Sequence, residues 1–418
     1  MSGSIKLKHA SGNGVIISAP SSNPAADRTL TLPSDADGVI AKTDSSGNLT
    51  VAGDLNTSNI NGGQISNRNL IINGAMNVHQ RGDASYTLNS SNTNNFIVDR
   101  FRVFSAAGTI VASQDTTVPD GQGFAKSIKL DCTVADASTE AEGYIEYRPE
   151  AQNFYHLAYG TSGAKTITVS FWVKSSLAAT YGFYYYIPDA GPRIYQTIFT
   201  ISSANTWEKK TITIAGDTGG SGFNNDTGVG AEIRIYFNGT SGQRGSSNQN
   251  SWGTNSSNRL PTGTNLLSST SNDFFFTGFQ IEVGSQATNY EFCSFAKELS
   301  YCQRYFQTSF TSNPSTTNTD NSGLVLFGGG RTGDSTSFLG GSYVQLSPAM
   351  RSAPTVTTFD VATPRNTNKC HRHTYGFTGS NDQPVTLTDV NINSFVVRSD
   401  SGNSANGIIY HWKCEAEL

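Results

Sequence analysis

The feature that most constrains the fold is a repeated alternation of apolar and polar residues with a period of two, set between turn-rich segments. In "KTITVSFWVKS", one face of an extended chain carries Ile167, Val169, Phe171 and Val173. This alternation is typical of a β-strand with one buried face. Similar segments follow the same pattern: "FIVDRFRVF", "KSIKLDCTV", "KKTITIAG", "AEIRIYFNG" and "DFFFTGFQIEVG". Without helical periodicity between them, they predict a mainly β chain with an antiparallel, jelly-roll-like β-sandwich over residues 69–292.

Residues 1–68 hold only short apolar fragments such as "SIKLKH", "GVIISAP" and "RTLTLP", separated by small polar residues and proline. None can build a core alone, because three or more strands with a shared apolar face are needed for independent stability. We therefore expect an extended anchoring or stalk segment that packs against other chains. The next region begins with "NLIINGAMNVHQRG", where residues 70–72 predict a short buried strand and Asn73-Gly74 predicts a tight turn.

The segment "SFAKELSYCQRYFQ" has the one convincing helical pattern, and it predicts a linking helix over residues 293–308. Ser294 is placed to cap the first turn. One apolar stripe, spaced at i, i+4, i+7 and i+11, is expected to form a trimer interface: Phe295, Leu299, Cys302 and Phe306.

A second β region follows over residues 309–418, and we expect a second β-sandwich domain there, which the resemblance described below implies is the distal tip. Its segments include "GLVLFGGG", "SYVQLSP", "TVTTF" and "SFVVRS". In the terminal "GIIYHWKCEAEL", Ile408, Tyr410, Trp412 and Cys414 alternate with polar residues. The pattern predicts a half-buried strand that fixes the C-terminus in a sheet.

Composition narrows the classes of partner. Charged residues make up 14% of the 418 residues, and the formal net charge is −4, without a dense basic run. Nucleic acid is therefore not expected as a partner, because its binding depends on Lys and Arg neutralising phosphates. No segment has the length of a signal peptide or membrane helix, which predicts synthesis in a cytoplasm and no membrane insertion. The five cysteines have no disulfide pattern, and we interpret them as small buried apolar residues.

Several motifs, in this order along the chain, resemble the tail fibres and receptor-binding proteins of tailed bacteriophages. They are "RTLTLPSDADGVIAKTDSSGNLTVAGDL", "NLIINGAMNVHQRG" with "FIVDRFRV", "FQIEVGSQATNYEFCSFAKELSYCQRYF", and "QLSPAMRSAPTVT" with "IIYHWKCEAEL". The chain departs from the family at Lys297, Val78 and His79. The resemblance implies a homotrimeric fibre located on the virion. Its N-terminal part would attach to a tail or adaptor protein, and its distal part would bind a glycan or protein of the host surface.

The sequence favours adhesion over catalysis. Glu140, Glu142, Glu146 and Glu150 cluster in sequence, as do Asp382 and Asp389, and either set could supply a glycosidase acid/base pair. We interpret them instead as solvated turn and strand-edge charges, because no solenoid repeat, nucleophile elbow or phosphate loop is present. The sequence therefore predicts a protein that is not an enzyme and needs no cofactor. An exopolysaccharide depolymerase and a structural adaptor carrying another tip remain the alternatives.

Two further motifs have a functional and a structural interpretation. The "RGD" at residues 81–83 could be an adhesion tripeptide, and we interpret it as a turn. His371 and His373 would share a face of an extended segment, and three copies on a threefold axis would resemble the iron sites of some long phage fibres. We favour surface loop histidines and predict no metal.

Recognition is expected in the distal loops, where side chains vary without disturbing a sheet. These loops combine glycines with hydrogen-bonding and aromatic side chains, and Trp252 and "YGFYYYIP" offer further rings for sugar stacking. The candidate receptor-binding residues are Arg331, Asp334, Tyr375, Asn381, Asp382, Asn403 and Trp252.

Overall fold

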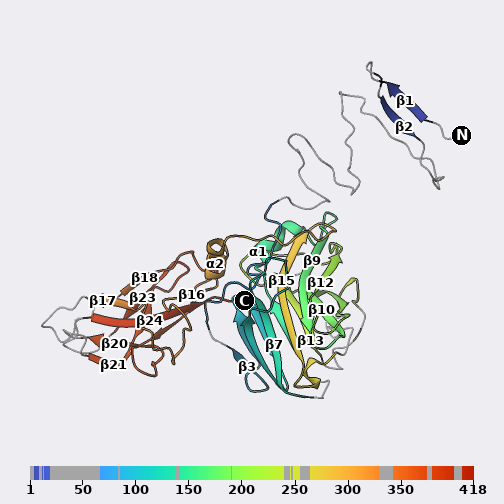
Figure 1. Cartoon of the computed structure of the whole chain (residues 1–418). Helices are drawn as coiled ribbons and strands as arrows, with labels where there is room; N and C mark the ends of the chain where they lie inside the picture. Colours follow the sequence, from blue (N-terminus) through green and yellow to red (C-terminus); the bar gives the residue numbers. More distant parts are fainter. Residues whose placement is uncertain are drawn as a thin grey trace. The chain divides into compact units, whose positions relative to one another are not determined.

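The computed structural model describes residues 4–8, 12, 14–18, 66–82, 85–136, 142–189, 191–239, 245, 248–254, 264–328, 342–373, 379–399 and 407–418. The chain divides into two compact units, Met1–Thr57 and Ser58–Leu418. In the first unit, β1 (Ser4–Lys8) and β2 (Gly14–Ser18) form an antiparallel ribbon (Figure 1). Within the described residues, no helix is long and apolar enough to cross a membrane.

Two antiparallel sheets form the larger lobe of the second unit, which we call the sandwich lobe (residues 66–292, Figure 1). The seven-stranded sheet has the order β14 (Trp252–Gly253), β11 (Arg193–Thr200), β10 (Thr180–Ile187), β13 (Glu232–Asn238), β8 (Gly143–Tyr147), β5 (Phe101–Ser105) and β4 (Asn94–Val98). The six-stranded sheet has the order β12 (Glu208–Ile214), β9 (Ile167–Ser175), β15 (Asp273–Val283), β7 (Ser127–Val134), β6 (Thr109–Asp115) and β3 (Tyr86–Leu88). Short helical turns connect them: α1 (Ala151–Phe154), η1 (Tyr155–Leu157) and η3 (Leu266–Ser268).

The alternation seen in the sequence builds the core of this lobe. The four predicted apolar residues of β9 are all fully buried between the two sheets: Ile167, Val169, Phe171 and Val173. The Phe276 ring of β15 lies 5.6 Å from the Phe171 ring, in the range of favourable aromatic pairs. Each such buried side chain contributes roughly 1.5–3 kcal/mol through removal of apolar surface from water. The predicted β-sandwich is confirmed.

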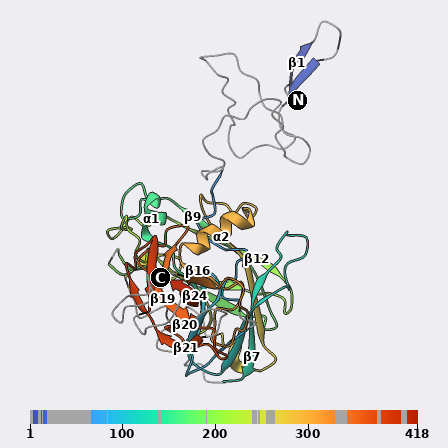
Figure 2. The same ribbon diagram turned by 90° about the vertical axis from the view of Figure 1, so that its left-hand side faces the viewer.

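The distal lobe (residues 306–418) is a smaller pair of sheets (Figure 2). The last strand, β24 (Gly407–Glu415), pairs with four strands: β16 (Phe306–Thr308), β17 (Val325–Gly328), β19 (Thr355–Phe359) and β20 (Lys369–His373). β21 (Gly379–Pro384) extends β20, and a three-stranded sheet packs nearby: β18 (Ser342–Gln345), β23 (Ser394–Arg398) and β22 (Thr386–Thr388). The predicted terminal strand is confirmed, with Tyr410, Trp412 and Cys414 in the core.

The predicted lead-in strand at residues 70–72 is wrong. The segment 66–82 contains no strand and makes only single backbone contacts such as the bond from Leu70 N to Ile281 O. The predicted turn is present, because Met76 N donates to Asn73 O at 2.9 Å, and Asn73 has a left-handed φ of 61°. The buried Asn73 amide then donates to the carbonyl oxygens of Val78 and Asp99. A side-chain amide, rather than a ladder, organises this entry segment.

The linking helix is shorter than predicted: α2 spans Phe295–Gln303, between the two lobes in Figure 1. The predicted cap is confirmed, since the Ser294 side chain accepts from Lys297 N. The single apolar stripe is wrong as a whole. Cys302 is 0% exposed and Phe306, which belongs to β16, is 1% exposed, so both pack within the chain. Phe295 is 60% exposed, and Leu299 is half-buried.

Buried ion pairs join the two lobes at the C-terminal end. Glu417 of the distal lobe pairs with Arg100 of the sandwich lobe and, at 3.2 Å, with Arg81. Asp99 adds a second carboxylate to Arg81 at 3.1 Å, and the Arg100 guanidinium lies 3.5 Å from the centre of the Tyr305 ring. These groups, Arg81, Asp99, Arg100 and Glu417, are called the junction ion pairs below.

A second set of contacts reinforces the same boundary. The fully buried Glu150 carboxylate accepts two hydrogen bonds from Arg304, at 2.6 and 2.8 Å, and one from the Tyr305 hydroxyl at 2.6 Å. Arg351 donates to the carbonyl oxygens of Ala416 and Thr227, one in each lobe. The relative position of the lobes therefore rests on buried charged groups rather than on a shared apolar core.

Replacing Glu417→Gln should destabilise the chain by about 3 kcal/mol, because two buried guanidinium groups lose a carboxylate. Glu415→Gln is the matched control: this side chain is 37% exposed, so less than about 1 kcal/mol is expected. Urea unfolding followed by tryptophan fluorescence measures both. Equal midpoints for the two variants would contradict a structural role for Glu417.

Candidate functional site

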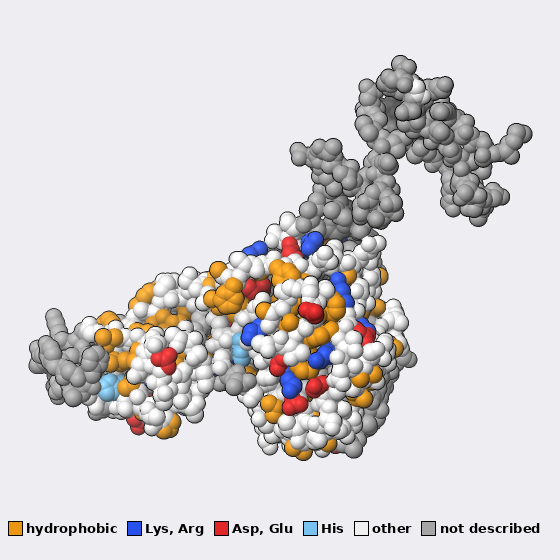
Figure 3. Space-filling model, viewed as in Figure 1, with side chains coloured by type: hydrophobic (Ala, Val, Ile, Leu, Met, Phe, Trp, Pro, Cys, Tyr) orange, Lys and Arg blue, Asp and Glu red, His pale blue; other side chains and the backbone are white. Residues whose placement is uncertain are grey.

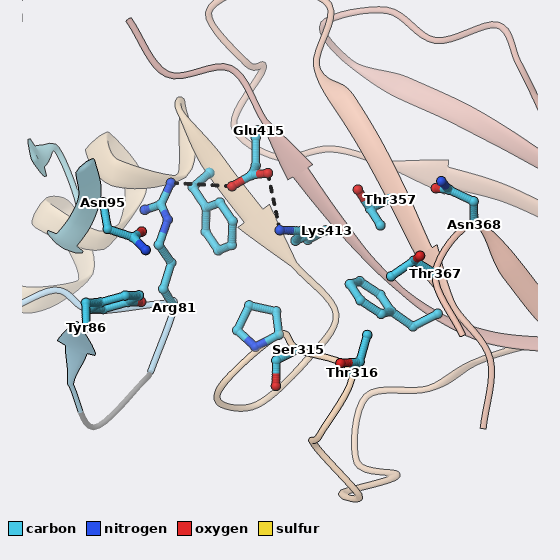
Figure 4. A pocket seen from close by; sticks show the side chains of 13 residues that line it. Arg81, Tyr86, Asn95, Ser315, Thr316, Thr357, Thr367, Asn368, Lys413 and Glu415 are labelled. Carbon is cyan, nitrogen blue, oxygen red and sulfur yellow. Dashed lines mark ion pairs between the residues drawn. The ribbon is translucent and has the colours of Figure 1, made fainter. Parts of the chain in front are cut away.

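A cleft of about 490 Å³ lies where the sandwich and distal lobes meet (Figure 4). Its lining combines aromatic, amide, hydroxyl and charged side chains. The lining residues are Arg81, Tyr86, Asn95, Phe306, Pro314, Ser315, Thr316, Thr357, Phe359, Thr367, Asn368, Lys413 and Glu415. Figure 4 shows Tyr86 and Asn95 on the side opposite Thr367 and Asn368.

The floor of the cleft comes from the distal sheet. Lys413 and Glu415 are two residues apart on β24, so they share the face opposite the buried Trp412 and Cys414. Lys413 lies opposite Thr357 of β19 in the antiparallel register. The alternation that fills the distal core thus places a cation and a carboxylate on the cleft side, where they pair at 3.3 Å.

The wall formed by the sandwich lobe depends on Arg81. Its guanidinium lies 4.1 Å from the centre of the Phe306 ring and 4.8 Å from that of Phe96, as cation–π contacts. Burial lowers the pKa of Arg81, but the neighbouring negative charges of Glu417 and Asp99 together outweigh burial. The pKa of Arg81 therefore lies above its usual value. Burial raises the pKa of Asp99 to about 6, against the lowering effect of Arg81. At neutral pH both groups remain charged.

Two turns of the distal lobe form the remaining walls, and hydrogen bonds fix their shape. Arg365 N donates to Thr316 O at 2.8 Å, which ties the turn at residues 314–316 to the turn before β20. Asp360 accepts from the backbone and side chain of Asn366. Burial raises the pKa of Asp360, but the hydrogen bonds from Asn366 and Asp382 outweigh burial and lower it. The walls are therefore held before any ligand arrives.

The cleft offers several uncharged hydrogen-bonding side chains that have no partner among the described residues. Within the part of the chain that the structure describes, five lining side chains make no hydrogen bond: Asn95, Thr316, Thr357, Thr367 and Asn368. Glu415 is the carboxylate among the lining residues, and it is paired with Lys413. Amide and hydroxyl groups can both donate and accept hydrogen bonds, which suits a ligand rich in hydroxyl groups.

Two of the predicted distal-loop residues, Asn381 and Asp382, are described, and neither lines this cleft. Arg331, Asp334, Tyr375 and Asn403 lie outside the described residues. Asn381 Oδ1 is 2.7 Å from His371 Nδ1, and Asp382 pairs with Lys369 at 3.1 Å. Both side chains therefore have a partner within the chain, and receptor binding at these positions stays a prediction.

Trp252, also predicted as a sugar-stacking residue, packs against the sandwich core. Three rings, of Tyr159, Tyr185 and Tyr195, lie 5.5 to 5.7 Å from its ring. Its Nε1 donates to Ala215 O at 2.8 Å. The ring therefore closes one edge of the core.

The interpretation of the acidic cluster as solvated charges is wrong for two of its members. Glu146 is buried and pairs with Arg102, Arg148 and Arg234. Glu150 is buried against Arg304 and Tyr305, as described above. Glu142 accepts from the Tyr236 hydroxyl, and Glu140 lies outside the described residues.

Arg81 of the "RGD" motif is buried in the junction ion pairs, so the motif does not present an adhesion tripeptide. The interpretation as surface loop histidines is wrong for His371, which is buried in β20, and the His373 side chain lies outside the described residues. No group of three or more His, Cys, Asp or Glu side chains in the described ranges could hold a metal ion. Four cysteines are buried as expected, whereas Cys293 is exposed, with its thiol 2.8 Å from Glu298 Oε2.

The comparisons with known proteins place the chain in no family. No family model and no curated protein match it. Among solved structures, the enzymatically active domain of bacteriophage CBA120 tailspike protein 4 is 12% identical over 51% of this chain and 21% of that chain, with a TM-score of 0.27. A family 11 carbohydrate-binding module from Clostridium thermocellum, in complex with a β-1,3-1,4-mixed-linked tetrasaccharide, is 15% identical over 49% and 98%, with a TM-score of 0.24. Similarities this distant do not bear on what the chain binds.

His411 lies beside the cleft, on the same face of β24 as Lys413 and Glu415 and opposite Phe359 of β19. It is fully buried, stacks on Phe310 at 3.9 Å, and places Nδ1 3.0 Å from Ser309 Oγ and Nε2 3.1 Å from Asp320 O. Burial, with the nearby Arg365 charge, lowers the pKa of His411 to about 4. The imidazole is therefore neutral in the folded chain at neutral pH.

This histidine predicts a loss of stability in acid. Its pKa is about 4 when folded and about 6.5 when unfolded, so the unfolded chain binds more protons between these values. The free energy of unfolding should fall by up to about 3 kcal/mol as the pH drops from 6.5 to 4. Carboxylates also titrate there, so the measurement is the difference in urea midpoints between wild type and His411→Gln across this window. Parallel pH profiles would contradict the prediction.

Proposed function

We propose that the chain is an adhesive tail-fibre protein of a tailed bacteriophage that binds a glycan of the host surface in the cleft between its lobes. The sequence motifs suggest the family, and the uncharged hydrogen-bonding lining of the cleft is the observation that carries the function. A sugar ring presents several hydroxyl groups, each of which needs a partner when it leaves water. The five uncommitted amide and hydroxyl side chains offer such partners on both sides of the cleft.

The surface around the cleft is consistent with this chemistry. On the face seen in Figure 3, the distal lobe carries few charged side chains, while the sandwich lobe carries both signs interspersed. Single contacts of this kind are weak, since one hydrogen bond contributes about 0.5–1.5 kcal/mol net. Several copies on one particle would raise the apparent affinity by roughly 10²- to 10⁴-fold.

Binding without cleavage is part of the proposal. Hydrolysis of a glycosidic bond ordinarily uses two carboxyl groups, about 5 to 9.5 Å apart, on either side of the scissile bond. Glu415 is paired with Lys413, and the nearby Asp99 and Glu417 are buried against Arg81. This arrangement favours an adhesin over the alternative of a depolymerase.

The paired variant Asn95→Ala, Asn368→Ala should weaken adsorption to host cells by about 10- to 100-fold, because two amides on opposite walls lose their contacts. Asn393→Ala is the matched control, an exposed asparagine of the distal lobe that does not line the cleft. Binding of the labelled protein to host cells measures the effect. Equal binding by both variants would place the receptor site elsewhere, and shortening of extracted host polysaccharide would favour the depolymerase.

The proposed fibre is a homotrimer attached to the virion through its N-terminal part. In the part described, α2 exposes Phe295 and Tyr301, and Tyr301 lines an apolar-walled hollow of about 630 Å³ together with Leu70 and Pro348. An exposed apolar surface of this kind supports a subunit contact.

Phe295→Asp should therefore reduce the assembly from three chains to one, because it places a charge in an apolar contact. Ala296→Asp, next to it on the exposed side of the same helix turn, should leave the assembly unchanged. Sedimentation equilibrium measures the mass. A folded wild-type monomer would contradict the trimer.

A further inference from the structure

The cations at the cleft are already neutralised by neighbouring carboxylates. Lys413 Nζ lies 3.3 Å from Glu415 Oε2, and Arg81 lies 3.9 Å from Glu415 Oε1. Arg81 also pairs with Asp99 and Glu417 at 3.1 and 3.2 Å. Figure 4 shows Glu415 between Arg81 and Lys413, connected to both. One carboxylate therefore neutralises the cation of the floor and contributes to the neutralisation of the cation of the wall.

The groups connected by these pairs balance in charge. Three are cations and three are carboxylates: Arg81, Arg100, Lys413, Asp99, Glu415 and Glu417. Arg100 and Glu417 are buried at the junction, whereas Glu415 is 37% exposed. Glu415 is thus the charged group of the set that is most open to a ligand.

A negatively charged ligand would meet an unfavourable arrangement here. A sugar carboxylate that reached Lys413 would lie beside Glu415, a like charge, unless it displaced Glu415 from the ammonium group. Like charges brought together at a binding interface cost several kcal/mol. An uncharged sugar neither displaces Glu415 nor is repelled by it, because its hydroxyl groups can form hydrogen bonds with the amide and hydroxyl side chains of the walls.

We propose that the cleft selects an uncharged glycan, one without uronic acid, sialic acid, phosphate or sulfate groups, and that Glu415 is the residue that sets this selectivity. The inference rests on the proposed function, because it assumes that the cleft binds a glycan. It goes further by naming the ligand's chemistry and the side chain that excludes acidic sugars.

The test uses the full-length protein on an array of bacterial surface oligosaccharides, both neutral and acidic, at pH 7.5 and low salt. Wild type should bind neutral members at least tenfold more tightly than acidic members of the same length. Glu415→Gln should shift this ratio about tenfold toward acidic members, because Lys413 and Arg81 lose a neutralising partner. The gain should disappear in 0.5 M NaCl, where charge interactions are screened, whereas added salt should not change the binding of neutral members.

Lys413→Gln is the matched variant of opposite sign. It leaves Glu415 with only the more distant Arg81, at 3.9 Å, so acidic members should bind still more weakly than to wild type. If the two substitutions only disturbed the structure of the cleft, both variants would instead bind all oligosaccharides of the array more weakly. Opposite shifts of the acidic-to-neutral ratio therefore support a charge filter.

The outcomes separate this inference from the proposed function. Preference of the wild type for acidic members, or an unchanged ratio in Glu415→Gln, would overturn the inference and leave glycan adhesion standing. Binding to no member of the array would overturn glycan binding itself, and the inference with it.

Discussion

The structure depends on one carboxylate near the end of the chain. Glu417 lies two residues beyond the last strand and pairs with two buried guanidinium groups, of Arg81 and Arg100, in the other lobe. A buried charge without a partner is strongly unfavourable, so these groups specify the junction even where a purely apolar contact would be as stable. The cleft exists because the junction ion pairs fix the sandwich wall against the distal floor. Arg81 belongs to both, as a junction residue and as a cleft wall.

The terminal strand connects this junction to the distal fold. β24 pairs with four strands and supplies Tyr410, Trp412 and Cys414 to the core. Its opposite face carries Lys413 and Glu415 into the cleft, and the chain then continues directly to Glu417. The terminal strand and the residues directly after it therefore provide part of the core of the distal lobe, the floor of the cleft and the contact that positions both lobes. Because these roles lie so close together in the chain, replacing the neighbouring Glu415 and Glu417 is expected to affect stability very differently.

The sequence predicted those parts of the fold that depend on local pattern. A period of two places Ile167 and Phe171 on one face whatever lies opposite, and the Ser294 cap needs only the first turn of its own helix. The failures occurred where distant residues intervene. The segment at 70–72 does not form a strand, because Asn73 binds Val78 and Asp99 instead, and α2 ends at Gln303 because Phe306 pairs as a strand with β24.

The candidate site shows the same division. Alternation along the terminal strand was enough to place Lys413 and Glu415 together on the face opposite Trp412 and Cys414, and composition predicted a partner other than nucleic acid. Their meeting with Arg81 and Asn95, more than 300 positions away in the chain, was not readable from the sequence. Local pattern determines which face a side chain occupies, because that depends on backbone geometry alone. Which faces meet is decided only by tertiary structure, because it depends on long-range pairing of buried charges, here those of Arg81, Arg100 and Glu417.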